Sequence, residues 1–201
     1  MIMCTESKLK QIKQSFRLLM NGETSRYMRE NGVNYHLNWG VAFPDLKKMA
    51  EEYGKDYHLA IELWKENIRE CKILATLIMP HDDMSPELAD LWMEQTQTVE
   101  MAEMLAHNLL QHLDFTPVLA FEWIASSLPL RQVCGYHIIS GKLAKGEEPD
   151  TRGIAEILDQ AVVAMHDDSM AVRHAAYNCL NRLAALGDDY DTLVQKALTR
   201  A

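Results

Sequence analysis

The sequence predicts an all-α protein with the architecture of a right-handed α-solenoid, in which antiparallel helix pairs stack on one another. The main observation is a repeated pattern, a Leu-Ala pair followed within five residues by a tryptophan: Leu59, Ala60 and Trp64; Leu88, Ala89 and Trp92; Leu119, Ala120 and Trp123. Each set ends one apolar helix and precedes another, and the unit recurs about every 30 residues. A unit of this size cannot bury its own apolar face, so successive units are expected to stack.

Composition supports the same fold class. The chain has 201 residues, of which 48% are hydrophobic, and it is rich in the helix formers Ala, Leu, Met, Glu and Lys. A chain of this length can build one continuous core. We therefore predict a single domain over residues 1–201, with N-terminal helices and a turn in 1–40 and stacked helix pairs in 41–201. No segment has a convincing strand pattern.

Five helices are predicted in the first 80 residues. The first is amphipathic, because apolar residues recur at intervals of three and four: Leu9, Ile12, Phe16 and Leu19. The others are expected at residues 25–30, 44–53, 56–66 and 68–78. Pro44 suits the first turn of its helix and Gly54 suits its end. A turn-rich stretch, residues 31–40, separates the second helix from the third.

The rest of the chain predicts further helices at residues 86–93, 98–113, 117–126, 129–142, 152–165 and 171–185, and a terminal helix from about residue 190. Ser85 before Pro86 is typical of a helix start, and Thr98 can cap the next helix. A loop at 144–151, which contains Gly146 and Pro149, divides the last three helices from the others.

The sequence favours a cytoplasmic protein. No apolar run approaches the length of a membrane span, so we expect no membrane association. The first twenty residues carry basic side chains on an amphipathic pattern instead of a signal-peptide core. The four cysteines lie far apart, and Cys71, Cys134 and Cys179 fall in apolar helical runs as small core residues. This usage is typical of a reducing compartment.

Residues 168–180 resemble the second helix of a HEAT repeat. Small and apolar residues form one helical stripe that lets a neighbouring helix approach closely: Val172, Ala175, Ala176, Cys179, Leu180 and Leu183. Such helices commonly begin with an aliphatic residue followed by arginine, a pair found at Ile68-Arg69, Leu130-Arg131 and Val172-Arg173. Two interpretations of these arginines stay open, ion pairs with acids of adjacent repeats and contact with a ligand.

Three stretches together resemble the DNA alkylation repair family, the AlkD-like HEAT-repeat DNA glycosylases. They are residues 40–50 with the motif Gly-Val-x-x-Pro, residues 58–64 with the motif His-x-x-x-x-Leu-Trp, and residues 69–75. The likeness extends from about Asn34 to about Leu183 and is that of a diverged member. It implies a HEAT-like fold and the excision of positively charged N3- and N7-alkylated purines from DNA.

The resemblance also implies a set of site residues. In the family an aspartate stabilises cationic sugar character, two tryptophans flank the lesion, and basic residues bind phosphates. With residues 108–110 aligned, the first tryptophan and the aspartate fall on Val99 and Glu103. The second tryptophan falls on Asn178, or on Tyr177 if the register shifts by one. A cationic leaving base needs little general-acid help, so a carboxylate at Glu103 could supply most of the transition-state stabilisation.

The aromatic part of this set is incomplete, because Val99 and Asn178 are not aromatic. The candidates for the missing aromatic side chains are Trp64, Trp92, Trp123 and Tyr177. For the tryptophans, packing between helices is the alternative interpretation.

Charge argues against DNA binding by one part of the chain. Between Lys72 and Arg131 there is no lysine or arginine, but there are nine acidic residues, which equals the net charge of −9. A surface of this sign repels phosphates, and Glu103 lies within it. The candidate DNA-binding cations therefore lie elsewhere, at Arg69, Arg131, Lys142, Lys145 and Arg173.

No metal, cofactor or nucleotide is expected. The sequences His81-Asp82-Asp83 and His166-Asp167-Asp168 combine imidazole and carboxylates, but each precedes a predicted helix, where Asp and Ser are ordinary caps. Neither sequence matches a known ligand spacing. The chain also has no nucleophilic triad, phosphate loop or nucleotide-binding fingerprint.

Three interpretations of function remain open. The first is a glycosylase active on alkylated double-stranded DNA, with Glu103 as its carboxylate. The second is a member without excision activity that binds a particular DNA structure. The third is a protein-interaction scaffold whose acidic surface binds a basic protein partner. The sequence therefore leaves open whether the protein is an enzyme.

Overall fold

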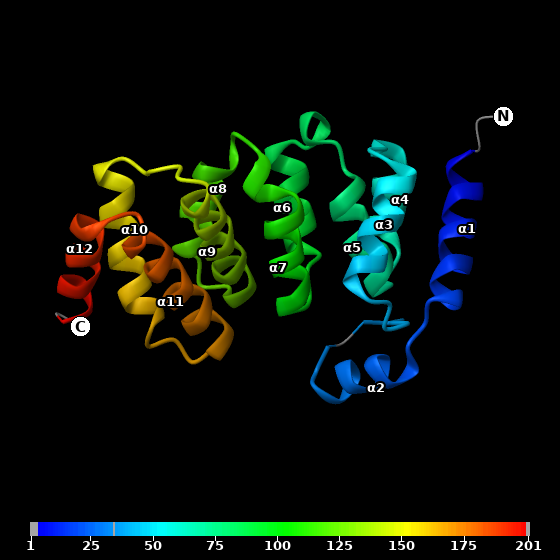
Figure 1. The fold of residues 1–201 in the computed structure, drawn as a ribbon, viewed down its shortest axis with the longest axis horizontal. Coiled ribbons are helices and arrows are strands. Elements are labelled where there is room, and N and C mark those ends of the chain that lie inside the picture. The colour runs from blue at the N-terminus through cyan, green and yellow to red at the C-terminus, as the bar shows by residue number, and fades with distance from the viewer. Residues whose placement is uncertain (1–3, 34, 200–201) are drawn as a thin grey trace. The chain divides into compact units, whose positions relative to one another are not determined.

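The computed structural model describes residues 4–33 and 35–199, and among these the regular structure is helical, as predicted (Figure 1). Asn34, where the family resemblance begins, lies outside the described residues. The chain divides into two compact units, Met1–Ser85 and Pro86–Ala201, called here the N-terminal and C-terminal units. The expectation of one domain over the whole chain stays a prediction.

The N-terminal unit contains the helices α1 (Thr5–Leu18), α2 (Gly22–Glu30), α3 (Phe43–Tyr53), α4 (Tyr57–Lys65) and α5 (Arg69–Ile78) and a 3₁₀ turn, η1 (His81–Asp83). Helix α5 packs against both α3 and α4, and α1 packs against α4. The side chains of α5 are buried almost throughout, so this helix forms the centre of the unit.

The C-terminal unit contains α6 (Pro86–Glu94), α7 (Val99–Asn108), the 3₁₀ turn η2 (Leu110–His112), α8 (Thr116–Ile124), α9 (Pro129–Ala144), α10 (Thr151–Ala164), α11 (Met170–Ala184) and α12 (Asp188–Leu198). Helix α9 packs against α8, α7 and α11, and α10 packs against α11. Helices α7, α9 and α11 therefore lie side by side as one layer, called here the α7–α9–α11 layer (Figure 1).

The predicted helices are confirmed in number and order, with one correction. A single helix was expected at 98–113, but α7 ends at Asn108, and Leu109 leaves the helical conformation before η2. The Thr116 hydroxyl bonds to the carbonyl oxygens of Leu110 and Leu113 at 2.9 and 2.8 Å, which ties the turn after α7 to the start of α8. A continuous helix would direct the Leu110 carbonyl along its own axis.

Other expectations about the core are also met. The thiols of Cys71, Cys134 and Cys179 are free and buried, as expected of small core residues. Leu19 differs, because it was placed on the apolar face of the first helix but lies past the end of α1 and is 41% exposed. No helix among the described residues is long and apolar enough to cross a membrane.

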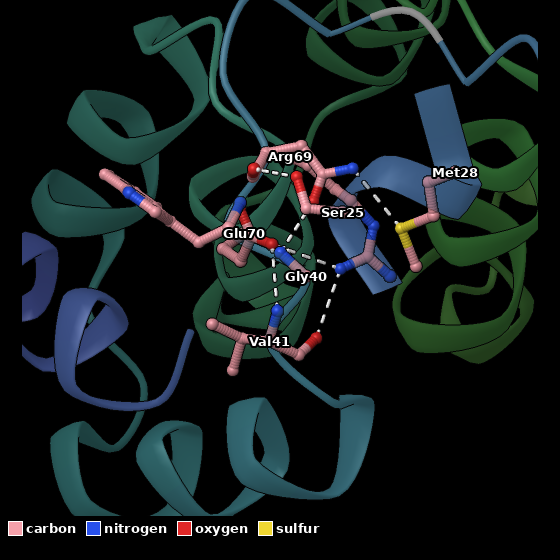
Figure 2. A network of polar contacts seen from close by, with 8 residues as sticks. Ser25, Met28, Gly40, Val41, Arg69 and Glu70 are labelled. Atoms are coloured by element: carbon pink, nitrogen blue, oxygen red, sulfur yellow. Dashed lines mark hydrogen bonds and ion pairs between the residues drawn. The ribbon is translucent and has the colours of Figure 1, made fainter. Parts of the chain in front are cut away.

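A buried ion pair holds the turn-rich stretch before α3 (Figure 2). The Glu70 side chain is fully buried, and its carboxylate accepts hydrogen bonds from the backbone N–H groups of Trp39 and Val41, both at 3.2 Å. The Arg69 guanidinium lies 3.3 Å from the same carboxylate and donates to the Val41 carbonyl at 3.2 Å. These bonds compensate both charges. They also satisfy the backbone groups of Trp39 and Val41, which form no hydrogen bond of a helix or a sheet.

Gly40 connects this stretch to the start of α2. Its φ of +69° favours glycine, and a Cβ atom here would lie 2.7 Å from the Ser25 nitrogen and still closer to the Asn21 carbonyl oxygen. The Asn21 N–H donates to the Trp39 carbonyl at 2.9 Å, and the Ser25 hydroxyl donates to the Asn38 carbonyl at 2.6 Å. The glycine of the Gly-Val-x-x-Pro motif therefore has a structural role.

We predict that Glu70→Ala lowers the free energy of unfolding by about 3–5 kcal/mol, because it leaves the Arg69 charge buried without a counter-charge. Urea unfolding followed by circular dichroism measures this loss. Glu62→Ala is the matched control, since Glu62 pairs with Lys65 at 2.6 Å on the surface with side chains 45% and 63% exposed. An exposed pair of this kind contributes at most about 1 kcal/mol. Equal losses in the two variants would contradict a structural role for the Glu70 pair.

Candidate nucleic-acid interface

Glu103 is on α7, at the surface of the C-terminal unit. Its side chain is 39% exposed, and Val99, one turn earlier, is 38% exposed. Residues four apart share one face of a helix, so the two positions matched to the catalytic pair of the family do lie together. Tyr177 and Asn178 are exposed on α11, the far helix of the same layer.

Two histidines adjoin the Glu103 carboxylate, and the three residues are called here the Glu103 cluster. The His137 Nε2 atom, on α9, lies 3.5 Å from Glu103 Oε1. The ring of His107, one turn along α7, meets the His137 ring edge-on with 4.9 Å between centroids. No sequence motif singles out either histidine, because only the packing of α9 against α7 brings His137 beside Glu103 and His107.

The pKa of His107 reflects its place in this cluster. Burial lowers the pKa below its ordinary value because it disfavours the imidazolium, and the neighbouring His137 lowers it further. The Glu103 carboxylate acts in the opposite direction. The cluster thus couples one carboxylate to two imidazoles across the contact between α7 and α9.

The three tryptophans belong to the helix packing. Trp64, Trp92 and Trp123 are 3%, 1% and 2% exposed and fill space between helices, which is the alternative interpretation of them. The Trp64 ring also carries the Lys72 ammonium 4.1 Å from its centroid. Tyr177 differs from the other aromatic candidates, because half of its side chain surface is exposed.

Three of the five candidate cations are engaged with carboxylates. Arg69 is buried against Glu70. The Arg131 guanidinium lies 2.6 Å from Asp90 and 3.6 Å from Glu94, and the Lys142 ammonium lies 3.1 Å from Glu147. Of the arginines, Arg131 fits the first interpretation, an ion pair with acids of the preceding helix pair, whereas Arg69 pairs with its own chain neighbour.

The other two candidate cations bind neutral acceptors and keep their net charge. The Lys145 ammonium donates to the Gln111 carbonyl at 2.9 Å and lies 3.1 Å from His112 Nδ1. Arg173, at the start of α11, donates to the backbone carbonyls of Asp167 and Asp168. Both cations belong to the C-terminal unit, and His112, which Lys145 contacts, has its Nε2 atom 3.2 Å from the carbonyl oxygen of His107 in the Glu103 cluster.

The two His-Asp-Asp sequences serve the backbone. The Asp167 carboxylate accepts from the Ser169 N–H at 2.7 Å, and the Ser169 hydroxyl accepts from the Val172 N–H at the start of α11. His81–Asp83 forms the turn η1. Within residues 4–33 and 35–199, no three His, Cys, Asp or Glu side chains are arranged to hold a metal ion.

Charge is distributed very unevenly between the two units. The C-terminal unit holds 17 of the 29 acidic residues and 8 of the 20 basic residues, whereas the N-terminal unit holds 12 of each. The N-terminal unit has no net charge, but within it residues 7–29 contain six basic side chains and one acidic side chain. Phosphate binding draws on positive charge, so this segment is the best placed by charge to meet a nucleic acid.

These features define an α-helical repeat protein with an exposed carboxylate on its α7–α9–α11 layer. The chain belongs to the family of DNA alkylation repair enzymes, whose family model matches residues 12–200. It is also similar to a solved structure described as "a new family of proteins related to the HEAT-like repeat DNA glycosylases with affinity for branched DNA structures".

That similarity covers 94% of this chain and 79% of the solved one, with a TM-score of 0.79 and 23% sequence identity, and it establishes the fold. No curated protein matches the chain. The resemblance to the DNA alkylation repair family and the α-solenoid of HEAT-like helix pairs are thus confirmed. The roles of the individual site residues stay predictions.

We predict opposite shifts in the pKa of His107 when its two neighbours are changed. His137→Ala removes a like-charged neighbour and unpacks the ring, so the pKa should rise, whereas Glu103→Gln removes the carboxylate that stabilises the imidazolium, so it should fall. NMR titration of the histidine ring protons measures both shifts. His174→Ala, at an exposed position of α11, is the control. A His107 pKa that stays constant in both variants would show that the cluster does not couple these groups.

Proposed function

We propose that this protein recognises DNA by the structure of the DNA, binding branched DNA more tightly than a linear duplex, and that it does not excise bases. Family membership and the likeness to a protein described as having affinity for branched DNA support the DNA-binding part of this proposal. The observation that carries the second part is the arrangement of Glu103, which faces the imidazole of His137 and has Val99, not an aromatic residue, one turn away.

The electrostatics of base excision explain why this arrangement matters. A carboxylate promotes loss of a cationic base by stabilising the positive charge that develops on the sugar. Two unit charges about 4 Å apart near a protein surface interact by about 4 kcal/mol. A protonated His137 at 3.5 Å would therefore cancel much of the stabilisation, and the neutral ring competes for the same carboxylate oxygen. Without a flanking tryptophan, an extruded purine also lacks its stacking surface.

A second candidate function is excision of N3- or N7-alkylated purines from double-stranded DNA, with Glu103 as the transition-state carboxylate. The exposure of Glu103 favours it, because 39% of its side chain surface is open to solvent. In this case Tyr177 is the aromatic candidate that could reach a substrate, since its ring is exposed while the tryptophans are buried.

A third candidate is a protein-interaction scaffold. The acidic excess of the C-terminal unit favours it, because such a surface attracts a basic protein partner and repels phosphates. In all three cases we propose that the protein acts in the cytoplasm, without a cofactor and without a bound nucleotide.

Two assays on the wild-type chain distinguish these candidates. We expect no single-turnover release of 7-methylguanine or 3-methyladenine from methylated duplex DNA at low salt. We also expect fluorescence anisotropy to give tighter, salt-sensitive binding to a four-way junction than to a linear duplex made of one junction strand and its full complement.

Either of two results would contradict the proposal. Release that disappears in Glu103→Gln would identify a glycosylase that uses this carboxylate. Failure to bind either DNA in a salt-sensitive manner would favour the protein-interaction scaffold.

A further inference from the structure

Three consecutive large apolar side chains are exposed where α1 meets α2. Leu18, Leu19 and Met20 are 87%, 41% and 57% exposed. Residues 17–22 are called here the α1–α2 corner. Single exposed apolar residues are normal on a protein surface, but a run of three is unusual and marks a site of interaction.

The α1–α2 corner is held firmly from behind. The Asn21 N–H donates to the Trp39 carbonyl, and the Asn21 side chain accepts from the Thr24 N–H at 3.0 Å. Phe16, fully buried in the last turns of α1, contacts the Trp39 ring with 5.6 Å between centroids. Trp39 is in turn bonded to the buried Glu70. A tip held in this way loses little conformational entropy when it binds.

Positive charge surrounds this corner in the sequence. Of the six basic residues in 7–29, Lys8 pairs with Asp56 and Lys13 pairs with Glu66. Arg26 is only loosely paired, at 3.7 Å from Glu30 with both side chains largely exposed. Lys10, Arg17 and Arg29 are exposed and make no ion pair with any carboxylate among the described residues.

We propose that the α1–α2 corner is a wedge for branched DNA, which inserts Leu18 and Met20 at the branch point while Arg17 and Arg29 bind the flanking phosphates. This proposal rests on the proposed function and identifies the residues that distinguish branched from linear DNA. Apolar wedges enter DNA by unstacking a base step, and that cost is lower where stacking is already interrupted. An apolar tip flanked by cations should therefore favour a branch over a continuous duplex.

Two double variants separate the wedge from the phosphate contacts. L18S/M20S removes the apolar tip, and R17Q/R29Q removes two cations. V118S/V163S is the matched control, because these residues are 66% and 71% exposed in the C-terminal unit. All the replaced side chains are exposed, and equal thermal unfolding by circular dichroism verifies that the variants fold.

The probes are a four-way junction with 2-aminopurine at its branch point and a linear duplex made of the 2-aminopurine strand and its full complement. In L18S/M20S the preference for the junction should fall about tenfold and the 2-aminopurine signal of unstacking should be lost, with duplex affinity unchanged. In R17Q/R29Q affinity for both DNAs should fall, and the slope of log K against log salt should be smaller by about 2. The control should behave as the wild type.

The proposal is overturned if L18S/M20S keeps the wild-type preference for the junction. That result leaves the proposed function intact, whereas a wild-type chain that binds neither DNA overturns both. An apolar tip near basic side chains could also bind an anionic lipid surface, and sedimentation with vesicles of phosphatidylglycerol and phosphatidylcholine tests this alternative. Vesicle binding that L18S/M20S abolishes, without any preference for the junction, would also overturn the wedge in favour of a lipid surface.

Discussion

The buried pair of Arg69 and Glu70 is the interaction on which the N-terminal unit depends most. Its bonds to the backbone at residues 39–41 fix a segment that has no regular structure of its own. Gly40 then allows that segment to approach the start of α2 closely, and α2 fixes the corner with α1. A desolvated carboxylate at the centre of a helical unit is therefore connected, through a few backbone hydrogen bonds, to an exposed apolar tip at its surface.

The family resemblance rests on residues that differ from those that base excision would require. The Gly-Val motif and Arg69 serve the packing of the N-terminal unit, so they can persist whether or not a member excises bases. The position that would stabilise a cationic sugar is occupied by Glu103, but it adjoins His137 in a unit that carries the whole formal net charge of −9. This separation of fold and chemistry agrees with a protein that keeps the HEAT-like scaffold and binds DNA through other residues.

Periodicity, caps and prolines were sufficient to predict the helices, because they act within one helix. The missed features depend on contacts between segments. The turn that follows Leu109 is bonded to the Thr116 hydroxyl of the next helix, and the Glu103 cluster requires α7 and α9 to lie side by side. Trp92 and Trp123 occupy apolar positions that fit either a core or a stacking surface, and only the packing distinguishes the two. Leu19 follows the periodicity of α1 but lies beyond the end of the helix, so the periodicity could not predict that Leu19 is exposed.

The most direct test of the account is hydrogen–deuterium exchange of the full chain with and without a saturating four-way junction. Exchange at residues 13–30 reports on the N-terminal helices, and exchange in α7, α9 and α11 reports on the surface around Glu103. The account predicts protection in residues 13–30 that is stronger with the junction than with a linear duplex, because the duplex contacts Arg17 and Arg29 but not the apolar side chains. Protection confined to the α7–α9–α11 layer, or equal protection by linear and branched DNA, would contradict it.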